Sequence, residues 1–195
     1  MIGVEKLIEI VQYSKEPIEC GYLVFARSSR IIGDCSKVID KNPNTKFGVI
    51  GAGTLYKSIG SAVLVVLNPK KRMSFKGYRI TLEGIVTSYP IEKDCKYLII
   101  YVDESNKIIQ VDRGVISGRE VVTIDSDLKC AKLGIVVYAY GKYERDVEDA
   151  QAIASVYEIA PPSRSKVVLG IPFAILTAGT VCAVVGGSKH EQGVH

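Results

Sequence analysis

The sequence predicts an all-β protein made of two tandem small β-barrels followed by one C-terminal transmembrane helix. Two stretches of the chain resemble each other in register, and short β-rich segments alternate with turn residues over most of the length. An uncharged apolar run lies near the C-terminus. The expected units are a first barrel at 1–70, a second barrel at 73–160, a linker at 161–166, a transmembrane helix at 167–187 and a tail at 188–195.

The internal repeat is found by aligning Cys20 with Cys95. "CGYLVFA" then lies over "CKYLIIY", "RSSRII" over "ESNKII", "KFGVIGAG" over "KLGIVVYAYG" and "SAVLVVLNP" over "AIASVYEIAP". The order of the blocks is preserved and the gaps fall in polar stretches, as in a duplicated gene. The alternative is that two β-rich stretches look alike without duplication. Duplication predicts two units of roughly 70–85 residues, the size of small β-barrels.

The strands of the second unit are the better defined. They are expected at 78–89, 96–104, 107–113, 132–144 and 150–159, with the turn "DESNK" closing a hairpin. In the first unit, the apolar stretch 47–67 is interpreted as two strands joined by "TLYKSIGS". A second membrane span there is disfavoured because Lys57 would lie at its centre, at a cost of about 3 kcal/mol.

The second unit resembles the OB-fold pattern. The residues that carry the resemblance are "GIVTSY…YLIIYVDESNKIIQVD…KLGIVVYAYGKYE…QAIASVYEI", in which a glycine lies in the opening strand and an acidic turn closes the hairpin. The fourth strand has the spacing of Gly134, Val137 and Gly141. The resemblance covers 76–160 well and 5–69 weakly, and it implies a five-stranded barrel without implying a function.

A fainter resemblance lies at 34–50. "DCSKVIDKNPNTKFGVI" is similar to stretches of the GIDE, or beside-a-membrane, domain of membrane-anchored ubiquitin ligases. The chain has no RING set of cysteines and histidines, so the ligase function is not carried over.

The predicted membrane anchor is the uncharged stretch 167–187, which as a helix would span roughly 30 Å. The alternative is a buried core helix. Arg164 and Lys166 precede the stretch and Lys189 follows it, which weakly favours a single-pass protein with its domains on the cytoplasmic side. A face of small residues predicts self-association or pairing with another helix. These residues are Gly170, Ala174, Ala178, Cys182 and Gly186.

The net charge of +4 is distributed unevenly. Residues 1–72 carry 11 Lys and Arg against 6 Asp and Glu, whereas residues 73–160 carry 11 against 14. The four cations of the linker "NPKKRMSFK" suit the anionic headgroups of a lipid bilayer, the alternative being a solvated interdomain linker. They are Lys70, Lys71, Arg72 and Lys76.

Catalysis and metal binding are not predicted. The only histidines, His190 and His195, lie in the tail, so Ser–His–Asp or Cys–His catalysis and histidine-ligated metal sites are excluded from residues 1–189. No cofactor motif is present, and we expect no cofactor, no metal and no enzymatic activity. The five cysteines are expected to be buried thiols, with a disulfide such as Cys20–Cys35 or Cys95–Cys130 as the alternative.

One face of the second unit is the candidate binding surface. Strand alternation is expected to place Leu98, Ile100 and Val102 inward and the neighbouring tyrosines outward. The candidate residues are Tyr97, Tyr101, Tyr138, Tyr140, Lys96, Lys107 and Arg113. The predicted function is that of a membrane-anchored adaptor that binds a protein partner. The alternative is a membrane-tethered protein that stacks single-stranded nucleic acid on these aromatic rings.

Overall fold

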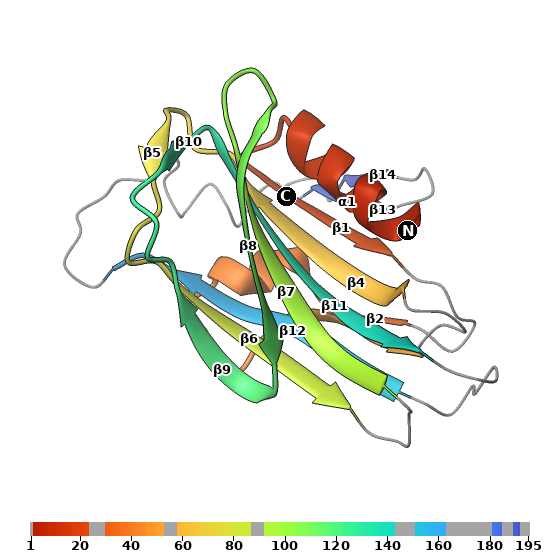
Figure 1. Ribbon diagram of the computed structural model, residues 1–195. Helices are drawn as coiled ribbons and strands as arrows, with labels where there is room; N and C mark the ends of the chain where they lie inside the picture. Colours follow the sequence, from red (N-terminus) through yellow and green to blue (C-terminus); the bar gives the residue numbers. More distant parts are fainter. Residues whose placement is uncertain are drawn as a thin grey trace.

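The structure is a computed structural model that describes residues 2–23, 30–52, 58–86, 92–142, 151–162, 181–184 and 189–191. These residues form a sandwich of two open β-sheets, with an α-helix on the outer face of the larger sheet (Figure 1). The all-β class predicted from the sequence is therefore confirmed.

The larger sheet has seven strands in the order β14-β13-β1-β4-β11-β7-β8. Their bounds are β1 Ile18–Leu23, β4 Ser58–Leu67, β7 Glu92–Val102, β8 Ile108–Ile116, β11 Lys132–Lys142, β13 Val181–Val184 and β14 Lys189–Glu191. All neighbours are antiparallel except β1 and β13, which are parallel.

The smaller sheet has five antiparallel strands in the order β2-β3-β12-β6-β9. Their bounds are β2 Arg30–Gly33, β3 Phe47–Ala52, β6 Arg79–Val86, β9 Gly118–Thr123 and β12 Gln151–Ala160. Two further strands, β5 (Met73–Ser74) and β10 (Lys129–Cys130), pair with each other as a two-stranded antiparallel ribbon. The helices are α1, Ile2–Tyr13, and the 3-10 helix η1, Cys35–Ile39.

The main hydrophobic core lies between the two sheets, and a second core lies between the larger sheet and α1. The central strands β4, β7 and β11 therefore bury side chains on both faces. In β7, Ile99 and Tyr101 belong to the core between the sheets, whereas Leu98, Ile100 and Val102 belong to the core beneath the helix. This double burial accounts for the nearly continuous apolar runs of the central strands.

Helix α1 was not predicted, although its apolar residues are spaced as in an amphipathic helix. Leu7 and Val11, one turn apart, are both buried against the larger sheet. Polar contacts fix the end of the helix: Gln12 Nε2 donates to the carbonyl of Asn106 at 2.9 Å, and Lys132 Nζ donates to the carbonyl of Gln12 and, at 2.7 Å, to Asn106 Oδ1. The helix is thereby tied to the β7–β8 turn and to the start of β11.

The two predicted OB-like barrels are wrong, because neither sheet of the described residues closes and strands of both predicted units share each sheet. Strand β4 of the first unit pairs with β11 of the second along most of its length. The repeat alignment also matches β3 with β11 and β4 with β12, and each of these matches joins strands of different sheets. The tandem-repeat interpretation is therefore corrected to one sandwich in which the described strands of both predicted units share each sheet.

The part of the predicted transmembrane helix that the structure describes, Val181–Val184, forms strand β13 and not a helix. Across the described residues, none of the helices has the length and apolar character needed to cross a bilayer. Most of 167–187 lies outside the described residues, including four of the five small residues expected to face a partner helix. The fifth, Cys182, belongs to strand β13, where it pairs with Cys20. The expected cytoplasmic location of the domains stays a prediction.

Individual strands were predicted well. All five strands expected in the second unit are present as β6, β7, β8, β11 and β12, and 47–67 forms β3 and β4 as expected. The turn "DESNK" is closed by two hydrogen bonds to Asp103 Oδ1, from the backbone N–H of Ser105 at 2.8 Å and of Lys107 at 2.9 Å.

Of the cysteines, one pair forms a disulfide that was given as the alternative, and two others are buried thiols as expected. Cys20 of β1 and Cys35 of η1 form a disulfide that joins the two sheets' layers, with 6.0 Å between their Cα atoms. Cys95 and Cys130 are buried and do not pair with each other. Burial raises the pKa of the Cys130 thiol to about 12, which keeps it protonated at neutral pH.

Candidate functional site

A cleft opens along one flank of the sandwich, where each sheet ends. Strand β8 is the last strand of the larger sheet and β9 is the last strand of the smaller one. The two strands follow each other in the chain and are joined by a tight turn in which Gly118 has a φ of +70° (Figure 1). Because no described strand pairs with their outer edges, this flank remains open between the sheets.

The flank cleft has a volume of about 430 Å3. Strand β7 contributes Tyr97 and Ile99, strand β8 contributes Gln110 and Asp112, and β9 with the segment after it contributes the remaining residues. These are Val122, Thr123, Ile124, Asp125 and Ser126. Apolar and polar side chains are thus combined in one cavity of a size that small ligands occupy.

A chain of hydrogen bonds fixes the polar side of the cleft. The hydroxyl of Tyr101 donates to Asp112 Oδ2 at 2.9 Å, and Gln110 Nε2 donates to Asp112 Oδ1 at 2.8 Å. Ser126 Oγ lies 3.4 Å from Gln110 Oε1 and in turn accepts from the backbone N–H of Leu128 at 3.3 Å. The carboxylate of Asp112 is therefore held in one position before any ligand arrives.

The aromatic side of the cleft depends on a glycine. Tyr97 and Gly114 are paired across β7 and β8, and the phenol ring covers the glycine. A Cβ placed on Gly114 would stand 2.5 Å from Tyr97 Cε1 and 2.7 Å from its hydroxyl oxygen. Only glycine allows the ring to lie against β8 in this way.

Burial and nearby carboxylates raise the pKa values of two tyrosines at the cleft. Burial raises the pKa of Tyr97, and the carboxylates of Glu120 and Asp112 raise it further. Burial also raises the pKa of Tyr101, together with its hydrogen bond to Asp112. Both phenols stay protonated at neutral pH, and the charges that act on them are anionic.

The predicted binding residues are divided between two faces. Tyr97 and Tyr101 lie on the inner face of the larger sheet, whereas Tyr138 and Lys96, which pair with each other, lie on the outer face. The outward position expected for Tyr101 is wrong, because its side chain is completely buried. Arg113 and Lys107 are exposed on β8 and in the turn before it.

Only Tyr97 of the predicted set therefore lines the cleft, and Tyr101 acts beneath it through Asp112. The side chain of Tyr140 lies outside the described residues. Sequence reasoning missed Gln110, Asp112, Asp125 and Ser126. Their polar side chains are typical of hairpins and loops, and only the alternating "REVVT" indicated that another strand faces them.

A second depression of about 480 Å3 lies at the end of the flank where β8 turns into β9. Polar and apolar atoms line it in similar proportion, and three of its apolar side chains are exposed: Ile85 at 37%, Val86 at 40% and Val115 at 57%. Asp94 is the one charged residue among those that line it.

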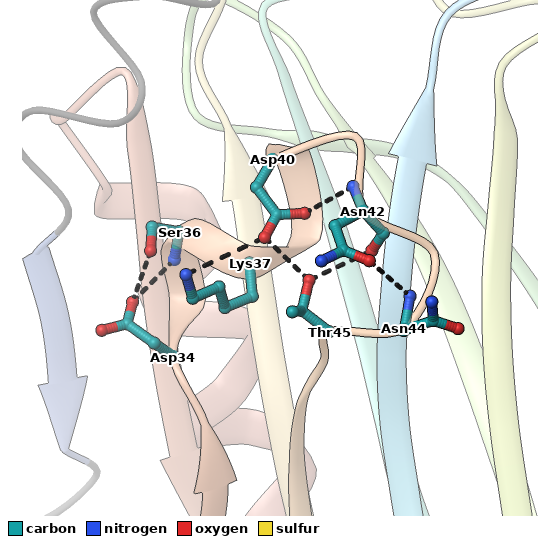
Figure 2. A network of polar contacts seen from close by, with 7 residues as sticks. All are labelled: Asp34, Ser36, Lys37, Asp40, Asn42, Asn44 and Thr45. Carbon is teal, nitrogen blue, oxygen red and sulfur yellow. Dashed lines mark hydrogen bonds and ion pairs between the residues drawn. The ribbon is translucent and has the colours of Figure 1, made fainter.

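The polar side chains of η1, of its N-cap Asp34 and of the loop that leads to β3 form hydrogen bonds within this segment (Figure 2). Asp34 accepts from the backbone N–H and the hydroxyl of Ser36, at 2.8 and 2.9 Å. Asp40 accepts from the backbone N–H of Asn42 at 2.8 Å and from Thr45 Oγ1 at 2.7 Å. These contacts hold the loop that leads into β3 in place. They lie within 34–50, the stretch that resembles the GIDE domain in sequence.

A charged network lies on the outer face of the smaller sheet. Lys46 Nζ donates to Glu83 Oε1 at 2.7 Å, the hydroxyl of Tyr157 donates to Glu83 Oε2 at 2.8 Å, and the Arg119 guanidinium lies 3.9 Å from the Tyr157 ring centre. Burial of Lys46 opposes its charge, but the contacts with Glu83 and Tyr157 raise the pKa of Lys46. The charged and polar groups of this network therefore find their hydrogen-bond and ion-pair partners within the network.

The four linker cations are all exposed on the segment around β5. Arg72 is engaged within the protein, since its Nε donates to the carbonyl of Lys129 at 2.9 Å and lies 3.6 Å from Glu104 Oε1. Contact of the four cations with lipid stays a prediction. Across the described residues, no group of three or more His, Cys, Asp or Glu side chains is arranged to hold a metal ion.

Comparison with known proteins matches no family model and no characterised protein sequence. Among solved structures, the chain is similar to the family 32 CBM of C. perfringens NanJ in complex with galactose. The two chains are 18% identical, the match covers 78% of this chain and 96% of that chain, and the TM-score is 0.41. The lectin domain of lectinolysin complexed with Lewis B antigen has 8% identity, coverages of 80% and 96%, and a TM-score of 0.39.

A Ruminococcus gnavus GH29 fucosidase in complex with fucose has 14% identity and a TM-score of 0.35. The match covers 70% of this chain but only 23% of the fucosidase, so the chain spans about a quarter of that protein's length. The OB-fold resemblance expected from the sequence is wrong, because the described strands of the second unit are divided between two sheets and neither sheet closes into a barrel. TM-scores below 0.5 assign neither a family nor a ligand to this chain.

Proposed function

We propose that the protein is a non-catalytic binding domain and that its ligand is a carbohydrate held in the flank cleft. One observation carries the proposal: the carboxylate of Asp112 is fixed by two donors in a cavity that Tyr97 also lines. A sugar presents hydroxyl groups, which donate and accept hydrogen bonds, together with an apolar face of C–H groups. The polar and apolar sides of the cleft match these two surfaces.

The cleft has free hydrogen-bonding capacity for such a ligand. Each oxygen of Asp112 accepts one hydrogen bond from the protein and keeps a lone pair for a ligand hydroxyl. Asp125 is exposed at the cleft and accepts no hydrogen bond from the described residues. The second hydrogen of the Gln110 amide is available to a ligand oxygen. A volume of about 430 Å3 accommodates one or two sugar rings.

The same features argue against the nucleic-acid alternative. Stacking of single strands requires aromatic rings beside cations that neutralise phosphate. Here burial and the carboxylates of Glu120 and Asp112 raise the pKa of the accessible tyrosine, Tyr97, and no described residue that lines the cleft is a cation. An anionic backbone would be repelled from this cleft.

Calorimetric titration of the full-length protein with galactose, fucose, glucose and lactose tests the proposal. We expect saturable binding of at least one sugar and no release of reducing sugar from lactose. Tyr97→Ala should weaken binding, whereas Val121→Ala, an exposed position of β9 that does not line the cleft, should not. Absence of saturable binding for the whole panel, or hydrolysis of lactose, would contradict the proposal.

A second candidate function is contact with a protein partner at the second depression. The observation that favours it is the exposure of three apolar side chains, Ile85, Val86 and Val115, around one depression. Val115→Asp should abolish co-purification of any such partner from native extract, whereas Ile109→Asp, an exposed apolar residue of β8 outside the depression, should not. An identical set of co-purified proteins from both variants would argue against this function.

A further inference from the structure

The charges around the flank cleft restrict its ligand further. Asp112 and Asp125 line the cleft, and Glu120 acts on the Tyr97 phenol from the same side. None of the described residues that line the cleft is Lys, Arg or His. The chain as a whole carries a net charge of +4, so the acidic cleft is a local property that the overall charge does not explain.

The nearby cations do not neutralise these carboxylates. Arg113 pairs with Leu98, which belongs to the core on the opposite face of the larger sheet. Arg119 lies over the ring of Tyr157 on the outer face of the smaller sheet. Neither side chain lines the cleft, and neither is within ion-pair distance of Asp112 or Asp125.

We propose that the flank cleft selects a sugar that carries a free, protonated amine. This inference rests on the carbohydrate-binding function proposed above and names the ligand class within it. An ammonium group donates up to three hydrogen bonds, which the lone pairs of Asp112 and Asp125 accept. The ring of Tyr97 provides a second favourable surface for a cation. Acetylation of the amine removes the charge, and an anionic sugar is repelled.

Two oligosaccharides with the same backbone test the inference: a glucosamine tetramer and its fully N-acetylated counterpart, each titrated into the full-length protein at low and high salt. We expect the free-amine tetramer to bind about fivefold more tightly at low salt, as for a partly exposed ion pair, and the difference to shrink at high salt. Asp125→Asn should remove the difference. Asp127→Asn, an equally exposed carboxylate that does not line the cleft, should keep it.

The possible failures are distinguishable. Equal binding of both tetramers would overturn the amine selectivity and leave carbohydrate binding in place. A preference for the amine that Asp125→Asn and Asp127→Asn reduce alike would also overturn it, because the charge would then act from outside the cleft. If neither tetramer and no neutral sugar binds, the carbohydrate-binding function fails and the selectivity fails with it.

Discussion

The ring of Tyr97 lies over Gly114 so closely that a Cβ on the glycine would stand 2.5 Å from Tyr97 Cε1. Gly114→Ala is therefore expected to push the ring into the cleft and to weaken sugar binding. Overpacking of this kind costs about 1–3 kcal/mol of stability. Calorimetric titration and urea unfolding measure the two effects. The control is Val115→Ala, at the next position but on the other face of β8, which should change neither sugar binding nor stability strongly. A Gly114→Ala variant that binds as well as wild type would contradict the placement of the ring.

Two buried tyrosines differ in their hydrogen bonds and should respond differently to loss of the hydroxyl. Tyr101 donates to Asp112, whereas the hydroxyl of Tyr78 is buried without a partner among the described residues. Tyr101→Phe should lower the free energy of unfolding by about 1–2 kcal/mol and should weaken ligand binding, because Asp112 loses a donor. Tyr78→Phe should be neutral or slightly stabilising. Equal destabilisation in denaturant titrations would contradict the assigned contacts.

Stability is expected to fall in alkali through the buried groups whose pKa values are raised, and Cys130 and Tyr78 are two of them. Burial raises the pKa of the Cys130 thiol from its ordinary value of 9.0 to about 12, and that of the Tyr78 phenol from 10.0 to about 12. The folded state therefore holds these protons more tightly than the unfolded chain between pH 9 and pH 12. Their contribution is complete below pH 9 and is lost as the pH rises through 12.

Urea unfolding between pH 8 and pH 11 measures this loss. Tyr78→Phe should make the decline above pH 10 shallower, because one of the groups with a raised pKa is removed. Tyr13→Phe, at a tyrosine that is 66% exposed, serves as the control and should leave the slope unchanged. If stability falls equally steeply with pH in the wild type, Tyr78→Phe and Tyr13→Phe, then Tyr78 does not contribute to the alkaline loss of stability.

The packing of α1 on the larger sheet depends on Gly134, where a Cβ would stand 2.5 Å from Val11 Cγ2. Gly134→Ala should displace the helix and lower stability by about 1–3 kcal/mol. Val11→Ala removes the clashing methyl groups, so the double variant should recover part of the loss. A double-mutant cycle measured by urea unfolding gives the coupling. Strict additivity of the two changes would contradict this contact.

The disulfide between Cys20 and Cys35 closes a loop with a sequence separation of 15. Its removal should cost about 3 kcal/mol in the loop-entropy model. Reductant should lower the stability of the wild type toward that of Cys20→Ala/Cys35→Ala and should have no effect on that variant. A wild-type protein whose unfolding is insensitive to reductant, with both thiols titratable after denaturation, would show that the bond does not form.

The extent of the strands was predictable from the sequence, but their assembly was not. Alternating apolar residues and the turn "DESNK" placed β7 and β8 correctly. The same local pattern fits a barrel and a sandwich equally, because it does not encode which strands pair over long separations. The pairing of β4 with β11 joins residues that the repeat assigned to separate units.

The face of β7 was misassigned for a related reason. The run "YLIIYV" is apolar on both faces, so alternation alone does not identify which face meets the other sheet. Helix α1 covers Leu98, Ile100 and Val102, which makes both faces buried and moves Tyr101 into the core between the sheets. Tyr97 was identified as a binding residue. Of the carboxylates that act on it, Asp112 lies on β8, which was expected as a strand, whereas Glu120 lies on β9, which was not among the expected strands.

Titration of isotope-labelled protein with the glucosamine tetramer, followed by backbone amide NMR, locates the ligand. Binding in the flank cleft predicts saturable shifts concentrated at Gln110, Asp112 and Ser126, with the tetramer recovered intact. Shifts confined to the outer face of the larger sheet, or no saturable shifts with any sugar of the panel, would contradict a carbohydrate site between β8 and β9.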